Sequence, residues 1–85
     1  MPSNKLTPQE FGRVILDATT AILHIDRANM SDNFVNLGGD SLSAEEVAEQ
    51  VCTRTGIELD GSDIIGAWQL LDLLAFAERG TSADG

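Results

Sequence analysis

The sequence predicts a small all-α protein. Apolar residues recur at spacings of three and four in separate stretches, residues typical of helix ends bound these stretches, and no stretch alternates long enough for a strand. The chain has 85 residues and is 42% hydrophobic, which is ordinary for a folded domain. We expect one domain at residues 7–79, a flexible N-terminus at 1–6 and a flexible tail at 80–85.

The first helix is predicted to begin at Pro8 and to end near Leu23. Thr7 is a good N-cap, Pro8 suits the first helical position, and Glu10 stands where a capping box needs an acid. The apolar residues of this stretch fall on one face at helical spacing: Phe11, Val14, Ile15, Ala18, Ile22 and Leu23. His24 is interpreted as a residue of the helix end and not as a ligand.

Residues 24–40 are predicted to form a long loop. They are rich in turn-forming Asn, Asp, Ser and Gly. Loops of this length in compact domains are usually functional or disordered. Phe34, Val35 and Leu37 are embedded in it, which indicates a loop pinned to the core.

The second helix is predicted from Ser41 to Thr55, with Gly56 as its left-handed end. Its expected buried face comprises Leu42, Ala44, Val47, Ala48 and Val51. Cys52 is expected near the core as a small residue. It is the only cysteine, so no intramolecular disulfide forms.

The remaining helices are shorter. Residues 57–59 are too short for a strand, and the turn at 60–63 is expected to cap a short helical turn over Ile64 and Ile65. The last helix is predicted from Gln69 to Arg79, with Gly80 as its stop. Three longer helices and one short helix make an all-α bundle.

The charge balance limits the classes of partner. Asp and Glu number 14 against 5 Lys and Arg, a formal net charge of −9. Nucleic-acid binding needs cations, and anionic membranes repel such a chain, so neutral or basic proteins are the expected partners. No signal peptide or apolar run of about 20 residues is present, so a cytoplasmic location is expected. The residues suggest no metal site.

Ser41 is the candidate functional residue, because it follows Gly38 and Gly39 at the start of a helix. A hydrolase nucleophile is disfavoured, since His24 is the only histidine and Ser43 replaces the second glycine of a G-x-S-x-G elbow. Two interpretations stay open from the residues alone. Ser41 is either an ordinary N-cap or an exposed hydroxyl that bears a phosphate ester at the helix N-terminus.

The run Leu37-Gly38-Gly39-Asp40-Ser41-Leu42, with Phe34 as its aromatic lead-in, resembles the attachment motif of acyl and peptidyl carrier proteins. The resemblance implies a four-helix bundle of the acyl carrier protein type without catalytic activity. It also implies that a phosphopantetheinyl transferase moves 4′-phosphopantetheine from coenzyme A onto Ser41. The terminal thiol of this arm then carries an acyl or aminoacyl group as a thioester.

The Gly-Gly-Asp-Ser-Leu form is similar to peptidyl, aryl and polyketide-type carriers. We therefore expect a peptidyl carrier in nonribosomal peptide or related secondary-metabolite biosynthesis. The chain's own start and short tail favour a freestanding monomer over an excised module. Its implied partners are the transferase, an adenylating or acyltransferring loading enzyme, and condensing or tailoring enzymes. The alternatives are an acyl carrier of polyketide or fatty-acid type and a small helical interaction domain without prosthetic group.

Several residues are candidates for partner docking. Glu45 stands where peptidyl carriers commonly have a large apolar residue, and with Glu46 and Glu49 it forms an acidic face. The alternative is that this face is only solvated and docks no partner. Trp68 and Gln69 replace the usual Pro-Thr before the last helix. Trp68 either fills the gap between the last two helices or contacts cargo or a partner. The predicted docking set is Leu42, Glu45, Glu46, Glu49, Ile64, Ile65 and Trp68.

Overall fold

The computed structural model describes residues 6–77. Within that range the chain forms α1 (Pro8–Leu23), α2 (Ser41–Thr55), α3 (Gly61–Gly66) and the 3-10 helix η1 (Leu70–Leu73), and no strand. Residues 74–77 continue η1 as α-helix. This confirms the predicted all-α fold. Of the predicted flexible ends at 1–6 and 80–85, residues 1–5 and 80–85 lie outside the described residues, as does the predicted helix end at Arg79.

Helix α1 begins and ends where the sequence predicts. The Thr7 side chain accepts a hydrogen bond from the Glu10 N–H at 3.0 Å, and the Glu10 carboxylate accepts from the Thr7 N–H at 3.2 Å. These two bonds form the predicted capping box. At the other end His24 adopts a left-handed conformation, with φ of 58°, which confirms it as a helix-end residue.

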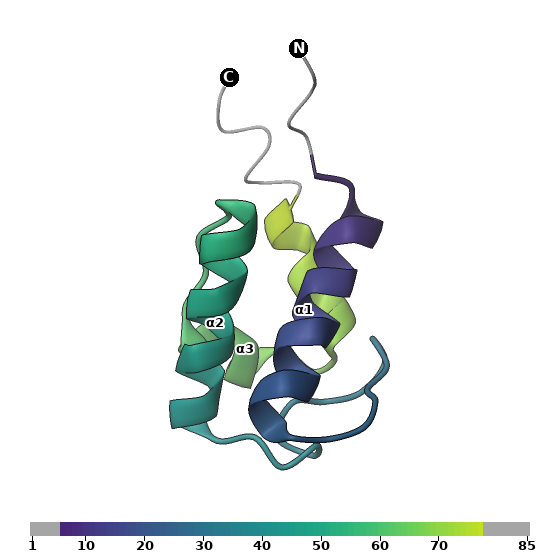
Figure 1. Ribbon diagram of the computed structural model, residues 1–85, viewed down its shortest axis with the longest axis vertical. Helices are drawn as coiled ribbons and strands as arrows, with labels where there is room; N and C mark the ends of the chain where they lie inside the picture. Colours follow the sequence, from purple (N-terminus) through teal and green to yellow (C-terminus); the bar gives the residue numbers. More distant parts are fainter. Residues whose placement is uncertain (1–5, 78–85) are drawn as a thin grey trace.

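Helices α1 and α2 stand side by side, with α3 and η1 closing the bundle (Figure 1). Helices α2 and α3 approach closely, because a Cβ added at Gly61 would lie 2.9 Å from the backbone nitrogen of Glu45. The core unites residues from every helix and from the long loop. Its largest fully buried side chains are Phe11, Phe34, Ile15, Ile64, Leu70, Leu73, Val47, Val51 and Thr19.

The last helix differs from the prediction, because it opens as a 3-10 turn and not as an α-helix from Gln69. The free N–H groups of a first helical turn need acceptors. Here the loop supplies them: the Leu70 N–H donates to the Asp32 carbonyl and the Leu71 N–H to the Met30 carbonyl, both at 2.8 Å. The long loop and the start of the last helix are therefore held together by backbone bonds.

Two expectations about burial are wrong. Leu42, expected on the buried face of α2, is 70% exposed, because it belongs to the first turn of the helix at the end of the bundle. Of the two interpretations of Trp68, the one in which it fills the gap between the last two helices is wrong, because the side chain is 82% exposed; contact with cargo or a partner stays a prediction. Hydrogen bonds from Asn33 to the carbonyls of Ala67 and Trp68 hold that linker, so the indole ring is not needed there.

Candidate functional site

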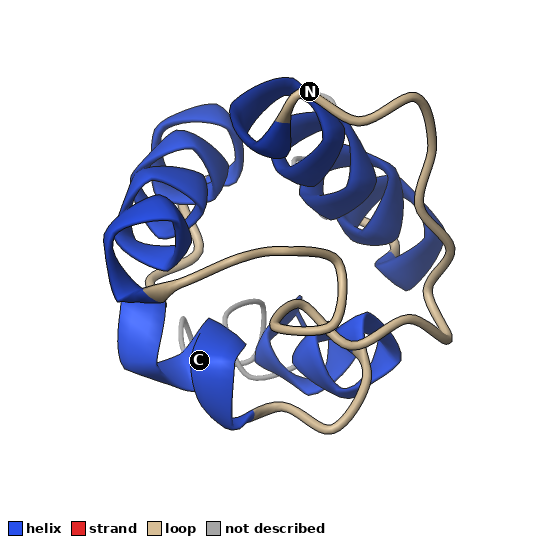
Figure 2. Cartoon of the chain, turned by 90° about the horizontal axis from the view of Figure 1, so that it is seen from below, coloured by secondary structure: helices blue, strands red, loops and turns tan. Residues whose placement is uncertain are grey.

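The long loop crosses the lower end of the bundle and leads into α2 (Figures 1 and 2). Its last residues form a compact turn. The N–H groups of Leu37 and Gly39 both donate to the Phe34 carbonyl at 3.1 Å, and that of Gly38 donates to the Val35 carbonyl at 2.9 Å. Gly38 has φ of 103°, a conformation that favours glycine.

Gly39 is required for a different reason. The Phe34 ring, 1% exposed, lies against the Gly39 backbone, and a Cβ at this position would overlap the ring. Gly38 thus allows the turn, and Gly39 allows the loop to be pinned through Phe34. Phe34 and the partly buried Leu37 confirm the predicted pinning to the core, whereas Val35, expected with them, is 48% exposed.

The helix cap at this site is Asp40. Its carboxylate accepts from the Ser43 N–H at 2.9 Å, and the Ser43 hydroxyl oxygen accepts from the Asp40 N–H at 2.9 Å. The Ser43 N–H, and then the Ser43 hydroxyl, which donates to the same carboxylate at 2.9 Å, stabilise the ionised form and lower the pKa of Asp40 below its ordinary value of 3.8. Ser43 therefore has a capping role that was not predicted from the sequence, since capping boxes usually use Glu or Gln there.

Ser41 is the first residue of α2 and is exposed. Because Asp40 is the cap, the interpretation of Ser41 as an ordinary N-cap is wrong. Within residues 6–77 its hydroxyl makes no hydrogen bond to another side chain or to the backbone. The free N–H groups of the first turn favour an anion at this end of the helix. An exposed hydroxyl in this position fits a phosphate ester.

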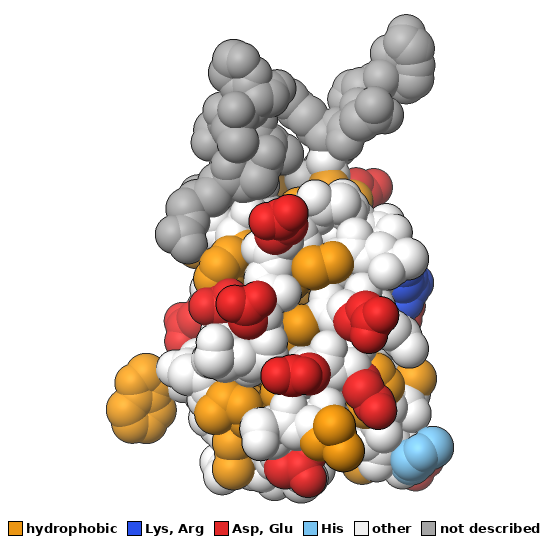
Figure 3. Space-filling model, turned by 90° about the vertical axis from the view of Figure 1, so that its left-hand side faces the viewer, with side chains coloured by type: hydrophobic (Ala, Val, Ile, Leu, Met, Phe, Trp, Pro, Cys, Tyr) orange, Lys and Arg blue, Asp and Glu red, His pale blue; other side chains and the backbone are white. Residues whose placement is uncertain are grey.

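The exposed face of α2 is acidic. Glu45, Glu46 and Glu49 are all exposed. Figure 3 shows acidic side chains spread over this side of the molecule, interspersed with apolar ones. A depression between α2 and α3 is lined by Glu45 and Asp60 together with Ala48, Gly61 and Ser62. This face therefore suits a basic surface better than an anionic one.

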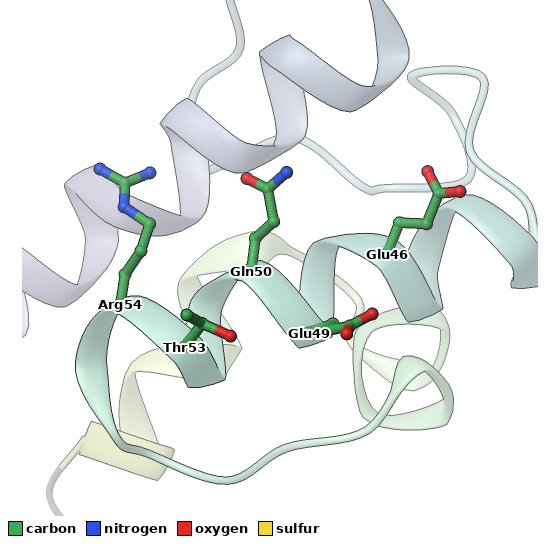
Figure 4. A pocket seen from close by; sticks show the side chains of 5 residues that line it. All are labelled: Glu46, Glu49, Gln50, Thr53 and Arg54. Atoms are coloured by element: carbon green, nitrogen blue, oxygen red, sulfur yellow. The ribbon is translucent and has the colours of Figure 1, made fainter.

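A second depression lies on α2 alone and is lined by Glu46, Glu49, Gln50, Thr53 and Arg54 (Figure 4). Glu46, Gln50 and Arg54 project toward one side at four-residue intervals. Arg54 also lies 3.7 Å from the Asp17 carboxylate of α1, and both side chains are exposed, so this pair contributes little stability. The depression is an open helix surface that ends the acidic face.

The two isoleucines of α3 have different surroundings. Ile64 is 1% exposed and belongs to the core, whereas Ile65 is half-buried. This confirms that one of the two faces the core. The burial of Ile64 argues against its place in the predicted docking set, whereas that of Ile65 stays a prediction. Cys52 is half-buried, with its sulfur 3.5 Å from the Leu59 N–H nitrogen, which confirms its expected place beside the core.

Asn33 was counted only as a turn former, yet it joins two segments. Its side-chain oxygen accepts from the Asn36 N–H at 3.0 Å, and its amide group donates to the carbonyls of Ala67 at 3.3 Å and Trp68 at 2.9 Å. The spacing of Asn33 and Asn36 is a signal for such a turn, because Asn side chains readily bind nearby backbone. The contact with Trp68 has no local signal.

Comparison with known proteins agrees with this site. A family described as "Phosphopantetheine attachment site" matches residues 13–77. A dimodular nonribosomal peptide synthase of Bacillus subtilis is 32% identical over 76 residues, which is 89% of this chain and 3% of that protein. The nonribosomal peptide synthetase astA of Aspergillus oryzae is 35% identical over 82 residues, 94% of this chain and 6% of the relative.

The family match over residues 13–77 and the small helical bundle identify a phosphopantetheine carrier domain. The chain belongs to the phosphopantetheine attachment site family, whose members carry a covalently attached 4′-phosphopantetheine, and its similarity to nonribosomal peptide synthetases is consistent with a peptidyl carrier protein. A third relative, vanchrobactin synthetase VabF of Vibrio anguillarum, is 40% identical over 58 residues, 68% of this chain and 2% of its own length. The chain thus spans only a few per cent of these relatives.

No solved structure matches the chain. None of the helices among residues 6–77 is long and apolar enough to cross a membrane. The same part of the chain contains no group of three or more His, Cys, Asp or Glu side chains placed to hold a metal ion.

Proposed function

We propose that Ser41 is the residue that bears the phosphopantetheine arm, and that the protein carries an aminoacyl or acyl intermediate between enzymes of nonribosomal peptide or related biosynthesis. The observation that carries the proposal is the exposed Ser41 hydroxyl at the first position of α2, free of any capping role. The arm supplies the thiol on which the thioester is formed.

In the attachment step the Ser41 Oγ forms a bond to the phosphorus of the pantetheine 4′-phosphate of coenzyme A. The pyrophosphate bond breaks, 3′,5′-adenosine bisphosphate leaves, and the serine proton passes to a base of the transferase. This chain's residues expose and orient the hydroxyl. The turn shaped by Gly38 and by the Phe34–Gly39 contact fixes the start of α2, and the helix N-terminus stabilises the phosphodiester anion.

The proposed partners follow from this role. They are a phosphopantetheinyl transferase, an adenylating or acyltransferring enzyme that loads the arm, and condensing or tailoring enzymes that act on the cargo. The relatives, which are named as nonribosomal peptide synthetases, support an aminoacyl or peptidyl cargo. The exposed acidic residues Glu45, Glu46 and Glu49, together with the exposed Leu42 and half-buried Ile65, support docking to basic enzyme surfaces with apolar contacts.

The test is incubation of the purified protein with coenzyme A and a broad-specificity phosphopantetheinyl transferase, followed by intact mass measurement. We expect one added phosphopantetheine on the wild type and on Ser62→Ala, an exposed serine control in α3, and none on Ser41→Ala. The absence of a mass gain on the wild type, or a gain that persists in Ser41→Ala, contradicts the proposal.

The freestanding state remains a prediction, because the relatives carry the matching region within far longer chains. An immunoblot of the native source with an antibody against this chain measures it. A band near 9.1 kDa agrees with a separate carrier, and a band of synthetase size contradicts it.

A further inference from the structure

Trp68 is the most exposed large apolar side chain among residues 6–77, at 82%. Its exposure does not come from a loose backbone. The Trp68 carbonyl accepts from Asn33, and two residues later Leu70 begins the backbone bonds to the long loop. An aromatic ring on a fixed backbone loses little conformational entropy on binding, and Trp is enriched among the residues that dominate interface energies.

The same bonds attach Trp68 to the segment that presents Ser41. Asn33 contacts the Trp68 linker with its amide group and the turn at Asn36 with its carbonyl oxygen. That turn continues through Gly39 into Asp40, the cap of the helix that starts with Ser41. The linker and the turn lie at the same end of the bundle (Figures 1 and 2), so Asn33 joins the backbone that carries the indole to the turn that leads to Ser41.

The surroundings of Trp68 are acidic. Asp72 binds the Gln69 N–H at 3.2 Å, and the backbone of Asp32 binds the Leu70 N–H. Residues 28–53 and 55–77 contain no Lys or Arg. A surface that receives this aromatic ring therefore complements it with an apolar pocket and a basic rim.

We propose that Trp68 and the Ser41 turn, joined by Asn33, form one docking surface for the phosphopantetheinyl transferase. The inference rests on the proposed function and names the partner. An enzyme that acts on the thiol meets the end of a long arm, whereas the transferase must bring its active site to the Ser41 hydroxyl itself. It therefore has to cover this end of the bundle, where Trp68 lies.

The first test measures transferase kinetics as a function of carrier concentration. Trp68→Ala is expected to raise the KM for the carrier about tenfold, which corresponds to about 1.4 kcal/mol, with kcat unchanged. Trp68→Phe retains the aromatic contact and should stay within about threefold of the wild type. An unchanged KM for Trp68→Ala overturns the inference. The failure of the proposed function looks different, because the wild type itself then gains no phosphopantetheine.

The second test separates the two contacts of Asn33. Asn33→Asp keeps an acceptor for the Asn36 N–H but places a carboxylate against the carbonyls of Ala67 and Trp68, to which it cannot donate. We expect a KM raised severalfold, whereas Asn36→Ala, the matched control within the same turn, behaves as the wild type. Equal KM values for Asn33→Asp and the control overturn the positioning role.

A spectroscopic readout shows where the indole binds, because Trp68 is the only tryptophan. Labelling with 5-fluorotryptophan gives one fluorine NMR signal, which should shift or broaden on addition of transferase, and should weaken in its response as salt rises. In Asn33→Asp the free signal should already differ from that of the wild type. The inference is overturned if the signal does not change on addition of transferase. A change on arm attachment alone then shows that the indole contacts the arm, and a change with protein concentration alone shows that it contacts a second copy of the chain.

Discussion

Helices α1 and α2 begin with the same device and differ in the residue that follows it. Each start has a cap whose side chain accepts from the backbone three residues on, Thr7 from Glu10 and Asp40 from Ser43. The next residue is Pro8 in α1 and Ser41 in α2. Neither of these residues is needed for the cap. The first position of α2 is therefore free for a functional side chain, while that of α1 is occupied by a residue that favours helix initiation.

The two helix regions also use glycine differently, and this gives the largest expected effect. Gly39→Ala places a Cβ into the Phe34 ring, so we expect a loss of about 1–3 kcal/mol in the free energy of unfolding and slower transfer to Ser41. Urea unfolding and transferase kinetics measure the two effects. The control is Gly12→Ala in α1, where the added Cβ meets Met30 and Leu74 only at 3.4 and 3.5 Å. Since alanine favours helix, this variant should be as stable as the wild type or up to about 1 kcal/mol more stable. Equal losses in both variants contradict the Phe34–Gly39 account.

Removal of the two caps sharpens the comparison. Thr7→Ala should lower the free energy of unfolding by about 1 kcal/mol without changing transfer to Ser41 at temperatures where the protein is folded. Asp40→Ala should lower both the stability and the transfer rate, because the Asp40 cap defines the helix end from which Ser41 projects. Discontinuous assays of phosphopantetheine transfer measure the transfer rates of the two variants, and urea unfolding measures their stabilities. A transfer rate that falls equally in both variants shows that only stability matters.

Charge reversal tests the acidic face of α2. The double variant Glu45→Lys with Glu46→Lys should slow the loading of cargo onto the arm by a cognate loading enzyme, chiefly because the two proteins encounter each other more slowly at low salt. The control combines Asp26→Lys, an exposed position in the long loop, with Glu10→Gln. Its net charge is close to that of the double variant, while α2 is unchanged. Rates that are the same for the double variant and the wild type at low salt assign Glu45 and Glu46 to mere solvation.

The smallest effect concerns pH. Since the folded-state pKa of Asp40 is lowered, its contribution to stability is present above the unfolded value near 3.8 and is lost as pH falls through the lower folded value. Asp40→Asn keeps an N-cap but removes the titration. Its free energy of unfolding should therefore fall less than that of the wild type between pH 5 and pH 3. These two pH values lie about one unit above and about one unit below the ordinary pKa range of carboxyl groups. Parallel losses in urea titrations contradict the assigned cause.

Local signals decided what the sequence could predict. The starts of α1 and α2 and the left-handed end at Gly56 depend on residues within four positions, and all three were predicted. Phe34 was predicted to pin the loop because an apolar residue among turn formers needs a place in the core. The carrier motif was evident from six consecutive residues around Ser41.

The rest depended on contacts between residues distant in sequence. The 3-10 start of the last helix arises from hydrogen bonds of Leu70 and Leu71 to the loop. The exposure of Trp68 arises from hydrogen bonds between its linker and Asn33, which is 34 positions from one bonded residue and 35 from the other. No pattern within one segment contains that information. Leu42 was misplaced because helical periodicity specifies a face of the helix but not how far its partner extends along it.

The most direct test of the account is to locate the attached arm within the chain. After the transferase reaction, the intact protein is fragmented in the mass spectrometer and the modified residue is read from the fragment series. The account predicts phosphopantetheine on Ser41, the residue after the cap, and on no other residue. Attachment at Ser43, or at any serine outside the first turn of α2, would contradict it.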